Sequence, residues 1–556
     1  SNWSVTHKNK NLEFILKGGN DYIDDRGRIT NYELTEPINL IGYIESKKGT
    51  VRANHYHPIQ EQKCLLIKGK YVSVIKDLVD ENSIIETRII NEGDIAVIHP
   101  NVIHTMVFLE DSIFLNLVRG EREHENYGLT HTIRNILVDE EFRLQIMNSY
   151  KAECRVCKSK DLEPVISFGK VPLANNLIDD LNQKAETFPL ELFKCNSCNN
   201  CQLSYNVDPK LMFDHYLYTS STSKSFIKHF DNAAEKYIKE YNLNKNDLII
   251  DIGSNDGIGL RKFKELEFDV LGIEPAKNIS EIANKNGITT INSYFNTDAI
   301  KIINEQYRKP KIILASNVFA HSNDLLEIAT SAMNLLDDDG VFIIEVQYLV
   351  DTIKDLTFDN IYHEHYNYWS VIALQNLFNQ LDYNISNVEK IDTHGGSIRI
   401  YIEKNQIKVN PSVKDYIKEE TVFGIDKPDV FIKFKSQIEE SKINVLKNIK
   451  NIKTASDKIA AYAAPAKAST KLNYYGISSD IIEFIVEDNP LKHNKIIPGV
   501  NIPIYDVDYL IEKDIKVVIV LAWNFFDYIV DKNKSLIDKG VRFISIKELE
   551  DPNFNF

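Results

Sequence analysis

The spacing of hydrophobic residues changes along this chain of 556 residues and indicates several kinds of domain. In residues 1–140, short apolar runs alternate with turns, and helical periodicity is nearly absent; the runs include NLIGYIES, KCLLIKGKYVSVIKD and DIAVIHP. Several short strands at close spacing are typical of a sandwich or barrel. We therefore predict a β-barrel here, followed by a helical connection at about 130–150.

Beyond residue 150 the pattern changes twice more. Residues 151–225 contain cysteines but few apolar residues for a core, so this segment needs an additional cross-link to fold. Residues 226–408 alternate apolar strands with amphipathic helices, which predicts a mainly parallel sheet covered on both faces. In residues 409–556 a long amphipathic helix over about 428–454 precedes a second α/β set. The sequence thus predicts a multidomain protein.

Composition and charge narrow the function. The chain has 65 Lys and Arg against 80 Asp and Glu, a net charge of −15, which argues against nonspecific nucleic-acid binding. It has no run of 18 apolar residues, so we expect no membrane partner. The first residues lack the apolar core of a signal peptide, and the clustered cysteines do not resemble a disulfide framework. We therefore expect a cytoplasmic protein.

Four cysteines form two short pairs. Cys154 and Cys157 are followed by Cys195 and Cys198, each pair with two residues between its members. Such knuckles can hold one tetrahedral Zn²⁺ through four thiolates, which leaves no open position, so we predict a structural zinc. Cys201 falls outside this spacing and is predicted to be a buried hydrophobic residue.

A glycine loop follows the predicted strand LIIDI and precedes a helix. Its pattern is DxGxxxG rather than GxGxxG, which favours S-adenosylmethionine over NAD, and an acidic residue ends the next strand, where it could accept ribose hydroxyls. An NAD-dependent enzyme is the alternative. The predicted cofactor residues here are Asp251, Gly253, Ser254, Asn255, Gly257 and Glu274.

The run Tyr362-His363-Glu364-His365 places two imidazoles and a carboxylate in the same predicted domain as the loop. Alone, such a pair of histidines is usually only a surface or core pair. In the same domain as a cofactor loop, the pair instead indicates proton abstraction. Together with VPLANNL, HGGS and LAWNFFDYIV, these motifs resemble the S-adenosylmethionine-dependent sugar C-methyltransferases, which act on nucleotide-linked 4-keto-6-deoxy sugars. The resemblance covers about residues 151–556.

This resemblance implies a zinc-binding domain, a Rossmann-like methyltransferase domain and a C-terminal α/β domain that helps hold the nucleotide. It implies methylation at C3 through an enolate, with His365 as general base and His363 as a packing residue. The nucleotide is expected to be dTDP, or else GDP. The other implied active-site residues are Tyr362, Glu364, His321, an aromatic from Tyr216 or Tyr218, Asn317 at the methionine end, and His394, Ser397 and Arg399 at the substrate.

The segment around Lys467 is a candidate anion-binding site. The segment AAPAKASTKLN predicts a strand, a turn of small residues and then the N-terminus of a helix. The backbone N–H groups at a helix N-terminus can bind an anion. Lys467 could meet a phosphate of the substrate there. The alternative is that the C-terminal domain only packs and dimerises.

The N-terminal barrel has its own candidate site. His55, His57 and Glu61, with His104 further on, resemble the two cupin motifs and would give a three-nitrogen, one-oxygen site for a divalent metal. The stretch from Arg52 to His57 also resembles sugar-nucleotide cupins such as epimerases and ketoisomerases, in which a histidine removes a proton and an arginine holds the diphosphate.

We therefore expect a bifunctional enzyme, in which a cupin epimerase and the methyltransferase act on the same 4-keto sugar, and a homodimer through the cupin. Two alternatives remain open. The cupin could be a noncatalytic sugar- or metal-binding module, or the whole chain could be a nonenzymatic zinc scaffold.

Overall fold

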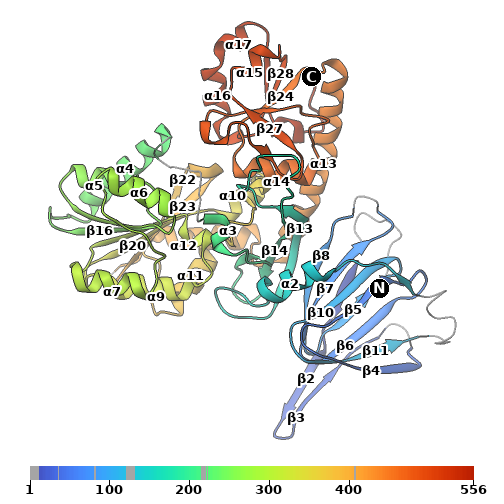
Figure 1. The fold of residues 1–556 in the computed structure, drawn as a ribbon. Helices are drawn as coiled ribbons and strands as arrows, with labels where there is room; N and C mark the ends of the chain where they lie inside the picture. Colours follow the sequence, from blue (N-terminus) through green and yellow to red (C-terminus); the bar gives the residue numbers. More distant parts are fainter. Residues whose placement is uncertain are drawn as a thin grey trace.

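The computed structural model describes residues 12–34, 37–80, 83–119, 132–213, 221, 223–405 and 408–556. A β-domain (blue in Figure 1) is followed by a small cysteine-bearing domain (teal), an α/β domain (green to yellow) and a second α/β domain (orange to red). The predicted multidomain fold class is confirmed.

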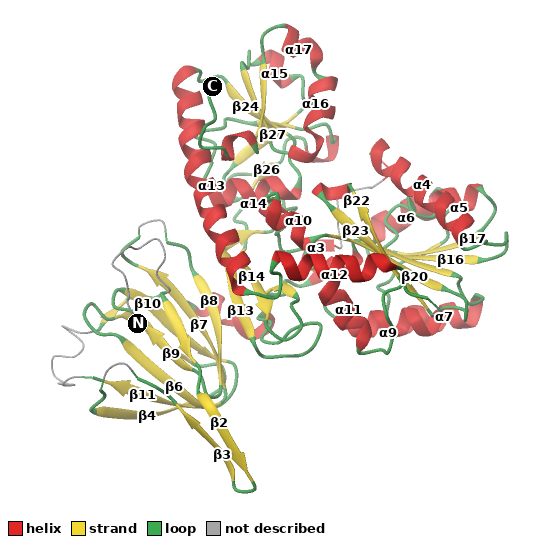
Figure 2. Cartoon of the chain, turned by 180° about the vertical axis from the view of Figure 1, so that it is seen from behind, coloured by secondary structure: helices red, strands yellow, loops and turns green. Residues whose placement is uncertain are grey.

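Two antiparallel five-stranded sheets pack together in the N-terminal domain, as expected of a cupin barrel. Their apolar faces meet around Leu66, Phe108 and Phe114, and burial of each such side chain contributes about 1.5–3 kcal/mol. One sheet has the order β1 (Glu13–Leu16), β9 (Ile95–Ile98), β6 (Gln62–Lys68), β11 (Ser112–Val118), β4 (Leu40–Ser46). The other has the order β12 (Ile133–Arg134), β5 (Val51–Tyr56), β10 (Val102–Phe108), β7 (Lys70–Asp77), β8 (Glu86–Asn91). A hairpin of β2 (Gly19–Asp24) and β3 (Gly27–Asn31) projects from the domain (Figures 1 and 2).

The small domain shares its sheet with the domain that follows it. Helix α2 (Glu140–Ser149) leads into it from the barrel, capped by Asp139, whose carboxylate accepts from Phe142 N at 2.8 Å. The sheet has the order β13 (Leu162–Pro172), β14 (Thr187–Cys195), β15 (Cys201–Leu203), β21 (Asn367–Tyr368). The short helix α3 (Pro209–Phe213) follows β15 along the chain. Strand β21 directly follows the predicted catalytic run, so that run is joined to the cysteine-bearing sheet.

The first α/β domain contains a seven-stranded sheet. Its order is β18 (Thr290–Ile291), β17 (Asp269–Ile273), β16 (Leu248–Ile252), β19 (Ile312–Ser316), β20 (Val341–Gln347), β23 (Ser397–Glu403), β22 (Asn387–Ile391). The first five strands are parallel, as is usual when helices cover both faces, and β23 runs antiparallel to both of its neighbours, β20 and β22. The helices are α4 (Lys224–Glu240), α5 (Arg261–Glu265), α6 (Lys277–Lys285), α7 (Thr297–Gln306), α8 (Val318–His321), α9 (Leu325–Leu335), α10 (Leu349–Lys354) and α11 (Val371–Asn379), with 3-10 turns η4 (Phe358–Asn360) and η5 (Thr393–Gly395).

Helix α12 (Pro411–Phe423) packs against β22 and α11 of the first α/β domain. The long helix α13 (Pro428–Ala455), which matches the helix predicted over 428–454, leads into the second α/β domain. Figure 2 shows α13 running from this domain to the cysteine-bearing sheet, where it contacts β13. The sheet has the order β26 (Ile496–Ile497), β27 (Ile502–Tyr505), β25 (Ile485–Val486), β24 (Ile459–Tyr462), β28 (Val517–Val520), β29 (Arg542–Ser545). Its helices and turns are α14 (Ala466–Tyr475), η6 (Pro490–Lys492), α15 (Tyr509–Glu512), η7 (Trp523–Phe525), α16 (Phe526–Lys532), α17 (Lys534–Asp538) and η8 (Glu548–Glu550).

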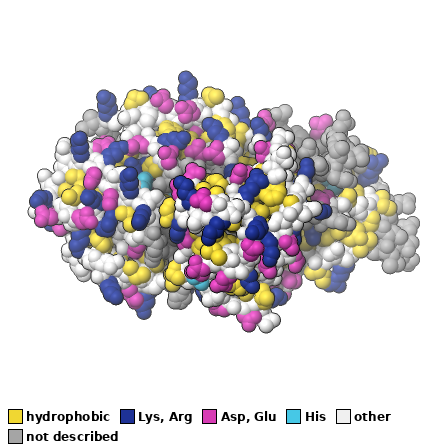
Figure 3. Space-filling view, turned by 90° about the horizontal axis from the view of Figure 1, so that it is seen from above, with side chains coloured by type: hydrophobic (Ala, Val, Ile, Leu, Met, Phe, Trp, Pro, Cys, Tyr) yellow, Lys and Arg dark blue, Asp and Glu magenta, His cyan; other side chains and the backbone are white. Residues whose placement is uncertain are grey.

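Charges are mixed on the face shown in Figure 3, where basic and acidic side chains stand beside one another among the described residues. A basic stripe typical of nucleic-acid binding is not seen on that face of the described chain. Among the described helices, none combines the length and apolar character needed to cross a membrane.

Candidate active site

The glycine loop after β16 turns too tightly for side chains at two positions. Gly253 has φ 66°, and a Cβ atom there would lie 2.6 Å from Val318 Cγ2. Gly257 has φ 90°, and its Cβ would lie 2.8 Å from Ile288 Cγ1. The loop therefore exposes bare backbone at the carboxyl end of the parallel sheet, where such sheets bind ligands.

Polar groups around this loop have unused hydrogen-bonding capacity. Asp251 Oδ1 and Ser254 Oγ are buried and have no hydrogen-bond partner within the described part of the chain. Burial raises the pKa of Asp251 well above its usual range, with further contributions from the charges of Glu274 and Glu345. Glu274 accepts from Asn255 N at 2.9 Å and Ala276 N at 2.7 Å, and each carboxylate oxygen keeps a second lone pair. This donor and acceptor set fits the adenosine part of S-adenosylmethionine.

Two predicted residues meet at the next strand end. Asn317 follows β19 with φ 64° and begins α8, and its Nδ2 lies 3.4 Å from Nε2 of His394. His394 stands in the loop before β23, with its ring centroid 5.2 Å from that of Phe226. The predicted methionine end of the cofactor site and the HGGS segment therefore adjoin.

His365 has a defined hydrogen-bond pattern. Its Nδ1 lies 3.1 Å from the carbonyl of Asn360 and so donates to it, which leaves the Nε2 lone pair to accept from the Tyr362 hydroxyl at 2.9 Å. Burial lowers the pKa of His365 well below its usual range, and His321 and His394 lower it further. The imidazole is therefore neutral at pH 7 and can take a proton at Nε2.

His321, from α8, lies beside His365 at a ring-centroid distance of 4.7 Å. Its Nδ1 donates to the backbone carbonyl of Glu364 at 2.5 Å, and burial lowers its pKa to about 4. Two neutral imidazoles therefore stand together at the end of the parallel sheet.

The Glu364 carboxyl group lies at the junction of three domains. Asn175 of the cysteine-bearing domain donates to it at 2.5 Å. Burial raises the pKa of Glu364 to about 7, against the lowering effects of Asn175 and of the Lys492 charge. The group therefore titrates near neutrality.

His363 faces the other way, as predicted for a packing residue. Its Nε2 lies 3.2 Å from the carbonyl of Phe188 and 3.1 Å from that of Pro189, both on β14. It ties the catalytic segment to the cysteine-bearing sheet.

Ser397 and Arg399 are engaged within the fold. Ser397 Oγ donates to the carbonyl of Thr393 at 2.8 Å. Arg399 forms an ion pair with buried Glu345, with its Nη2 at 2.6 Å and Nε at 2.8 Å from Oε1, and His229 Nε2 lies 3.0 Å from the other oxygen. The guanidinium that was expected to meet substrate thus already has a carboxylate partner. Tyr216 and Tyr218 lie outside the described residues.

Lys467 lies on the first turn of α14 and is 7% exposed. Its Nζ stands 4.9 Å from the centroid of Trp523, whose Nε1 donates to Asp359 at 2.6 Å. Burial lowers the pKa of Lys467 to about 8, while the Asp359 charge raises it. The predicted anion-binding lysine is thus packed against the domain that carries His365.

The four predicted zinc ligands converge. The Sγ atoms of Cys154, Cys157, Cys195 and Cys198 all lie within 4.8 Å of one another. The pair Cys154–Cys198 is 3.5 Å apart and the pair Cys157–Cys195 3.6 Å, close to the roughly 3.8 Å of a tetrahedral site with Zn–S bonds of about 2.3 Å. Cys201 is fully buried outside the cluster, as predicted, and burial raises the pKa of its thiol to about 12.

The cupin histidines also converge. His104 on β10 lies opposite His55 on β5, and His55, His57 and His104 bring ring nitrogens within 4.8 Å of one another. Nε2 of His55 and Nε2 of His104 are buried and have no hydrogen-bond partner in the described chain. Burial lowers the pKa of His55 to about 4, helped by His57, and holds that of His104 well below its usual range. His55 and His104 are therefore neutral at pH 7.

Glu61 is not the residue that meets these histidines, which corrects the expected ligand set. Its carboxylate pairs with Lys63 at 3.2 Å, whereas Gln62 Oε1 lies 2.9 Å from His57 Nε2. Strand β6 begins at Gln62, and alternation along a strand turns neighbouring residues to opposite faces. Arg52, the expected diphosphate contact, donates to Ser46 Oγ at 2.6 Å and to the Glu45 carbonyl at 2.8 Å.

The sequence reasoning missed four residues of this region: Asn175, Asp359, Lys492 and Trp523. Asn175 and Trp523 lie in VPLANNL and LAWNFFDYIV, segments that served only as a resemblance. A polar residue in an apolar run and one of only three tryptophans were signals that could have identified them. Asp359 and Lys492 carry no such signal.

Solved structures similar to parts of the chain have low scores. A 3,4-ketoisomerase, QdtA from Thermoanaerobacterium thermosaccharolyticum, solved with TDP, is 24% identical and covers 23% of this chain and 89% of its own, with a TM-score of 0.19. A SAM-dependent methyltransferase from Archaeoglobus fulgidus is 14% identical and covers 32% of this chain and 94% of its own, with a TM-score of 0.27.

Sequence comparisons cover the chain from Cys154 onward. Three family models match: a putative zinc binding domain at residues 154–213, a methyltransferase domain at 226–388 and a C-methyltransferase C-terminal domain at 392–546. The C-methyltransferase NovU of Streptomyces niveus is 32% identical over 396 residues, which span 70% of this chain and 94% of that relative. The chain belongs to the C-methyltransferase family.

Proposed function

We propose that this protein transfers a methyl group from S-adenosylmethionine to C3 of a nucleotide-linked 4-keto-6-deoxyhexose, with dTDP or GDP as the nucleotide. The observation that carries the proposal is neutral His365, whose Nε2 lone pair lies beside His321 at the end of the cofactor sheet. A ketone at C4 makes the C3 hydrogen acidic, and a positioned neutral imidazole suits its removal.

Each residue of the catalytic segment has a separate role. The carbonyl of Asn360 holds His365 Nδ1 as the donor, so Nε2 takes the C3 proton. The Tyr362 hydroxyl, now donating to that lone pair, would turn to the sugar when substrate binds. Glu364, with a pKa of about 7, would hold a sugar hydroxyl, oriented by Asn175. Arg399 and Glu345 would act by fixing β20 and β23 behind the site.

S-adenosylmethionine supplies an electrophilic methyl group when bound. The residues that would hold it are Asp251, Gly253, Ser254, Asn255, Gly257, Glu274 and Asn317. Their part is to fix its adenosine and methionine ends and to exclude water, which positions the methyl group.

The test is formation of S-adenosylhomocysteine by the purified chain with dTDP- or GDP-linked 4-keto-6-deoxyhexose. We expect turnover with the ketone and none with the matched sugar nucleotide that carries a hydroxyl at C4, because that sugar cannot form the enolate. Equal turnover of both sugars would contradict the proposed chemistry.

We further propose that the cupin is an epimerase that enolises the same 4-keto sugar. His55 or His57 would serve as base: burial lowers the pKa of His55, whose Nε2 has no partner among the described residues, and His57 lies beside it in the same cluster. Gln62 offers a neutral amide where a carboxylate would favour a divalent cation, so acid–base chemistry is better supported than a metal site. The alternative is a noncatalytic sugar- or metal-binding cupin.

The double variant H55N/H57N distinguishes an epimerase cupin from a noncatalytic one. In D2O the wild type is expected to incorporate deuterium at C5 or another carbon beside the ketone, and the variant to lose about 100-fold or more of that exchange while methyl transfer continues. If exchange outside C3 is absent from the wild type, the cupin is not an epimerase. Loss of a second bound metal in the variant would then identify a metal-binding module.

We also propose that two copies pair through the cupin. Ile41 and Tyr43 are 60% and 63% exposed on the edge strand β4, and an exposed apolar edge is a surface for pairing with another chain. Sedimentation of the chain as a monomer at micromolar concentration would contradict this pairing.

A further inference from the structure

One face of helix α14 is directed into the catalytic segment of the neighbouring domain. Lys467, Thr470 and Lys471 recur at the spacing that places residues on one side of a helix. Thr470 Oγ1 donates to the carbonyl of Ile361 at 3.2 Å, and Lys471 Nζ lies 3.9 Å from Asp359. The first turn of this face carries the Lys467 ammonium.

Trp523 fixes the position of that ammonium between two active-site segments. Its indole N–H donates to Asp359, which neighbours the residue whose carbonyl holds His365. Its ring presses on the HGGS loop so closely that a Cβ at Gly395 would lie 2.3 Å from Trp523 Cη2. Lys467 therefore lies over an indole that contacts both the His365 segment and the His394 loop.

The charge of Lys467 is felt at both imidazoles. Burial is the main cause that lowers the pKa of His394 to about 3, and Lys467 is the next. Lys467 also contributes to the lowering for His365, after burial and the two neighbouring histidines. Together with the contacts of Trp523, this places the ammonium beside the two segments that carry His365 and His394.

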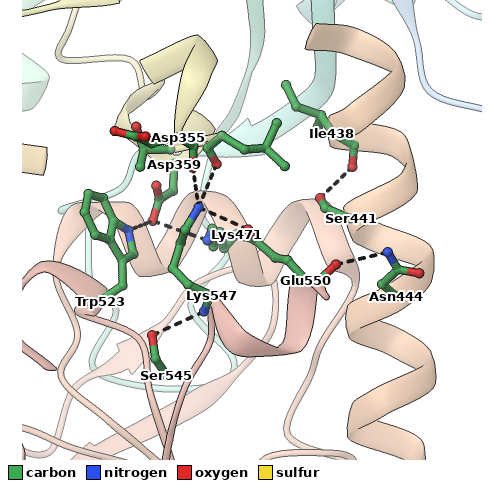
Figure 4. A network of polar contacts seen from close by, with 12 residues as sticks. Asp355, Asp359, Ile438, Ser441, Asn444, Lys471, Trp523, Ser545, Lys547 and Glu550 are labelled. Atoms are coloured by element: carbon green, nitrogen blue, oxygen red, sulfur yellow. Dashed lines mark hydrogen bonds and ion pairs between the residues drawn. The ribbon is translucent and has the colours of Figure 1, made fainter. Parts of the chain in front are cut away.

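A buried polar network surrounds the carboxylate nearest to this ammonium. Figure 4 shows Asp359 meeting Trp523, and Lys471 pairing with Glu550 at 2.7 Å. Lys547 pairs with the other oxygen of Glu550 at 3.1 Å and donates to the carbonyl of Asp355 at 2.6 Å. Asp359 Oδ2 is thus shared by Trp523 and Lys471, while Asp359 Oδ1 has no hydrogen-bond partner in the described chain, and the Asp359 charge raises the pKa of Lys467 and so favours its ammonium form. Lys467 itself forms no ion pair or hydrogen bond among the described residues beyond its contact with the ring.

We propose that Lys467 is a catalytic residue whose ammonium stabilises the enolate oxygen O4 of the sugar during methyl transfer. This inference rests on the proposed function. When the C3–H bond breaks, its proton goes to His365 Nε2 and its electron pair spreads onto O4. When C3 bonds to the methyl carbon, that charge returns to the new bond, and the carbon–sulfur pair leaves with the sulfur of the donor. A fixed cation at O4 lowers the energy of the charged state.

A phosphate contact is the competing role, and the structure favours it less. Helix α14 has Pro465 at its N-cap and no side-chain cap, but the preceding amide of Ala464 already donates to the Glu487 carboxylate at 2.6 Å. An anion at this helix start would lie near that carboxylate. The Lys467 ammonium instead lies over Trp523, the indole that contacts Asp359 and the Gly395 loop.

The test compares K467M and K467R with the wild type in two assays. One follows C3 proton exchange of the 4-keto sugar nucleotide in D2O, with S-adenosylhomocysteine filling the cofactor site. The other measures the Kd of free dTDP or GDP. K513M, at an exposed lysine of the same domain, is the matched control.

We expect K467M to lower saturated exchange and kcat about 100- to 1,000-fold while the Kd of the free nucleotide is unchanged, with partial recovery in K467R. A raised nucleotide Kd with normal saturated exchange would overturn the inference in favour of a phosphate contact. Normal values in both assays would also overturn it. If the wild type itself neither exchanges nor methylates, the proposed function fails, which is a separate outcome.

Discussion

Replacing His365 with Asn is expected to lower methyl transfer about 100- to 10,000-fold while S-adenosylmethionine still binds, because a positioned general base contributes about that much. Asn can still donate to the carbonyl of Asn360 but has no basic nitrogen in place of Nε2. Formation of S-adenosylhomocysteine at saturating sugar nucleotide measures the loss, and calorimetry measures cofactor binding.

The matched control is H363Q, because His363 faces away from the site and Gln can still donate to the carbonyls of Phe188 and Pro189. We expect H363Q to stay within about tenfold of the wild type in kcat, a difference of about 1.4 kcal/mol in barrier. If H365N kept full activity, another group would be the base, and His321 is the nearest imidazole.

Loss of zinc is expected to abolish activity through the structure of the site. Structural zinc contributes about 10–16 kcal/mol in small zinc peptides, so the cysteine-bearing domain should unfold without it. Arg155, inside the first knuckle, donates to the carbonyls of Leu203 and Tyr366 at 2.9 and 3.1 Å. The domain also holds Glu364 through Asn175. Loss of the metal therefore removes the support of the catalytic segment.

The variant C195S tests this directly. We expect bound zinc to fall from one ion per four-cysteine cluster to none, with a clear fall in Tm and loss of methyl transfer, as followed by metal analysis and thermal unfolding. C201A is the control, since Cys201 lies outside the cluster and should keep the metal. A C195S protein that retains zinc and activity would show that these four thiolates are not the ligand set.

Short contiguous motifs were predictable from sequence because their chemistry depends on local spacing. The loop from Asp251 to Gly257 needed only a buried strand and glycines at positive φ, and the cysteine knuckles needed only two turns of fixed length. His55 and His57 were predictable for the same reason, since alternation puts residues two apart on one face; His55 lies on β5, His57 directly follows it, and their ring centroids are 4.7 Å apart.

Contacts between segments that are distant in the chain could not be predicted from the sequence. Gln62 rather than Glu61 meets His57, and because neighbouring residues of a strand turn to opposite faces, a difference of one residue decides which side chain reaches the histidines. Trp523 and Asp359 are 164 positions apart, so their hydrogen bond follows only from how two domains pack. The HGGS motif predicts that Arg399 contacts substrate, but Arg399 is paired with Glu345 on the neighbouring strand.

The central claim is that the methyl group is bonded to C3 of a 4-keto sugar nucleotide, and the most direct test locates that group. The purified chain would be incubated with S-adenosylmethionine carrying an isotope-labelled methyl group and with dTDP- or GDP-linked 4-keto-6-deoxyhexose, and the product examined by NMR. We predict a labelled methyl bonded to carbon at C3, with loss of the C3 proton signal. A label on oxygen or nitrogen, or no labelled sugar with either nucleotide, would contradict the account.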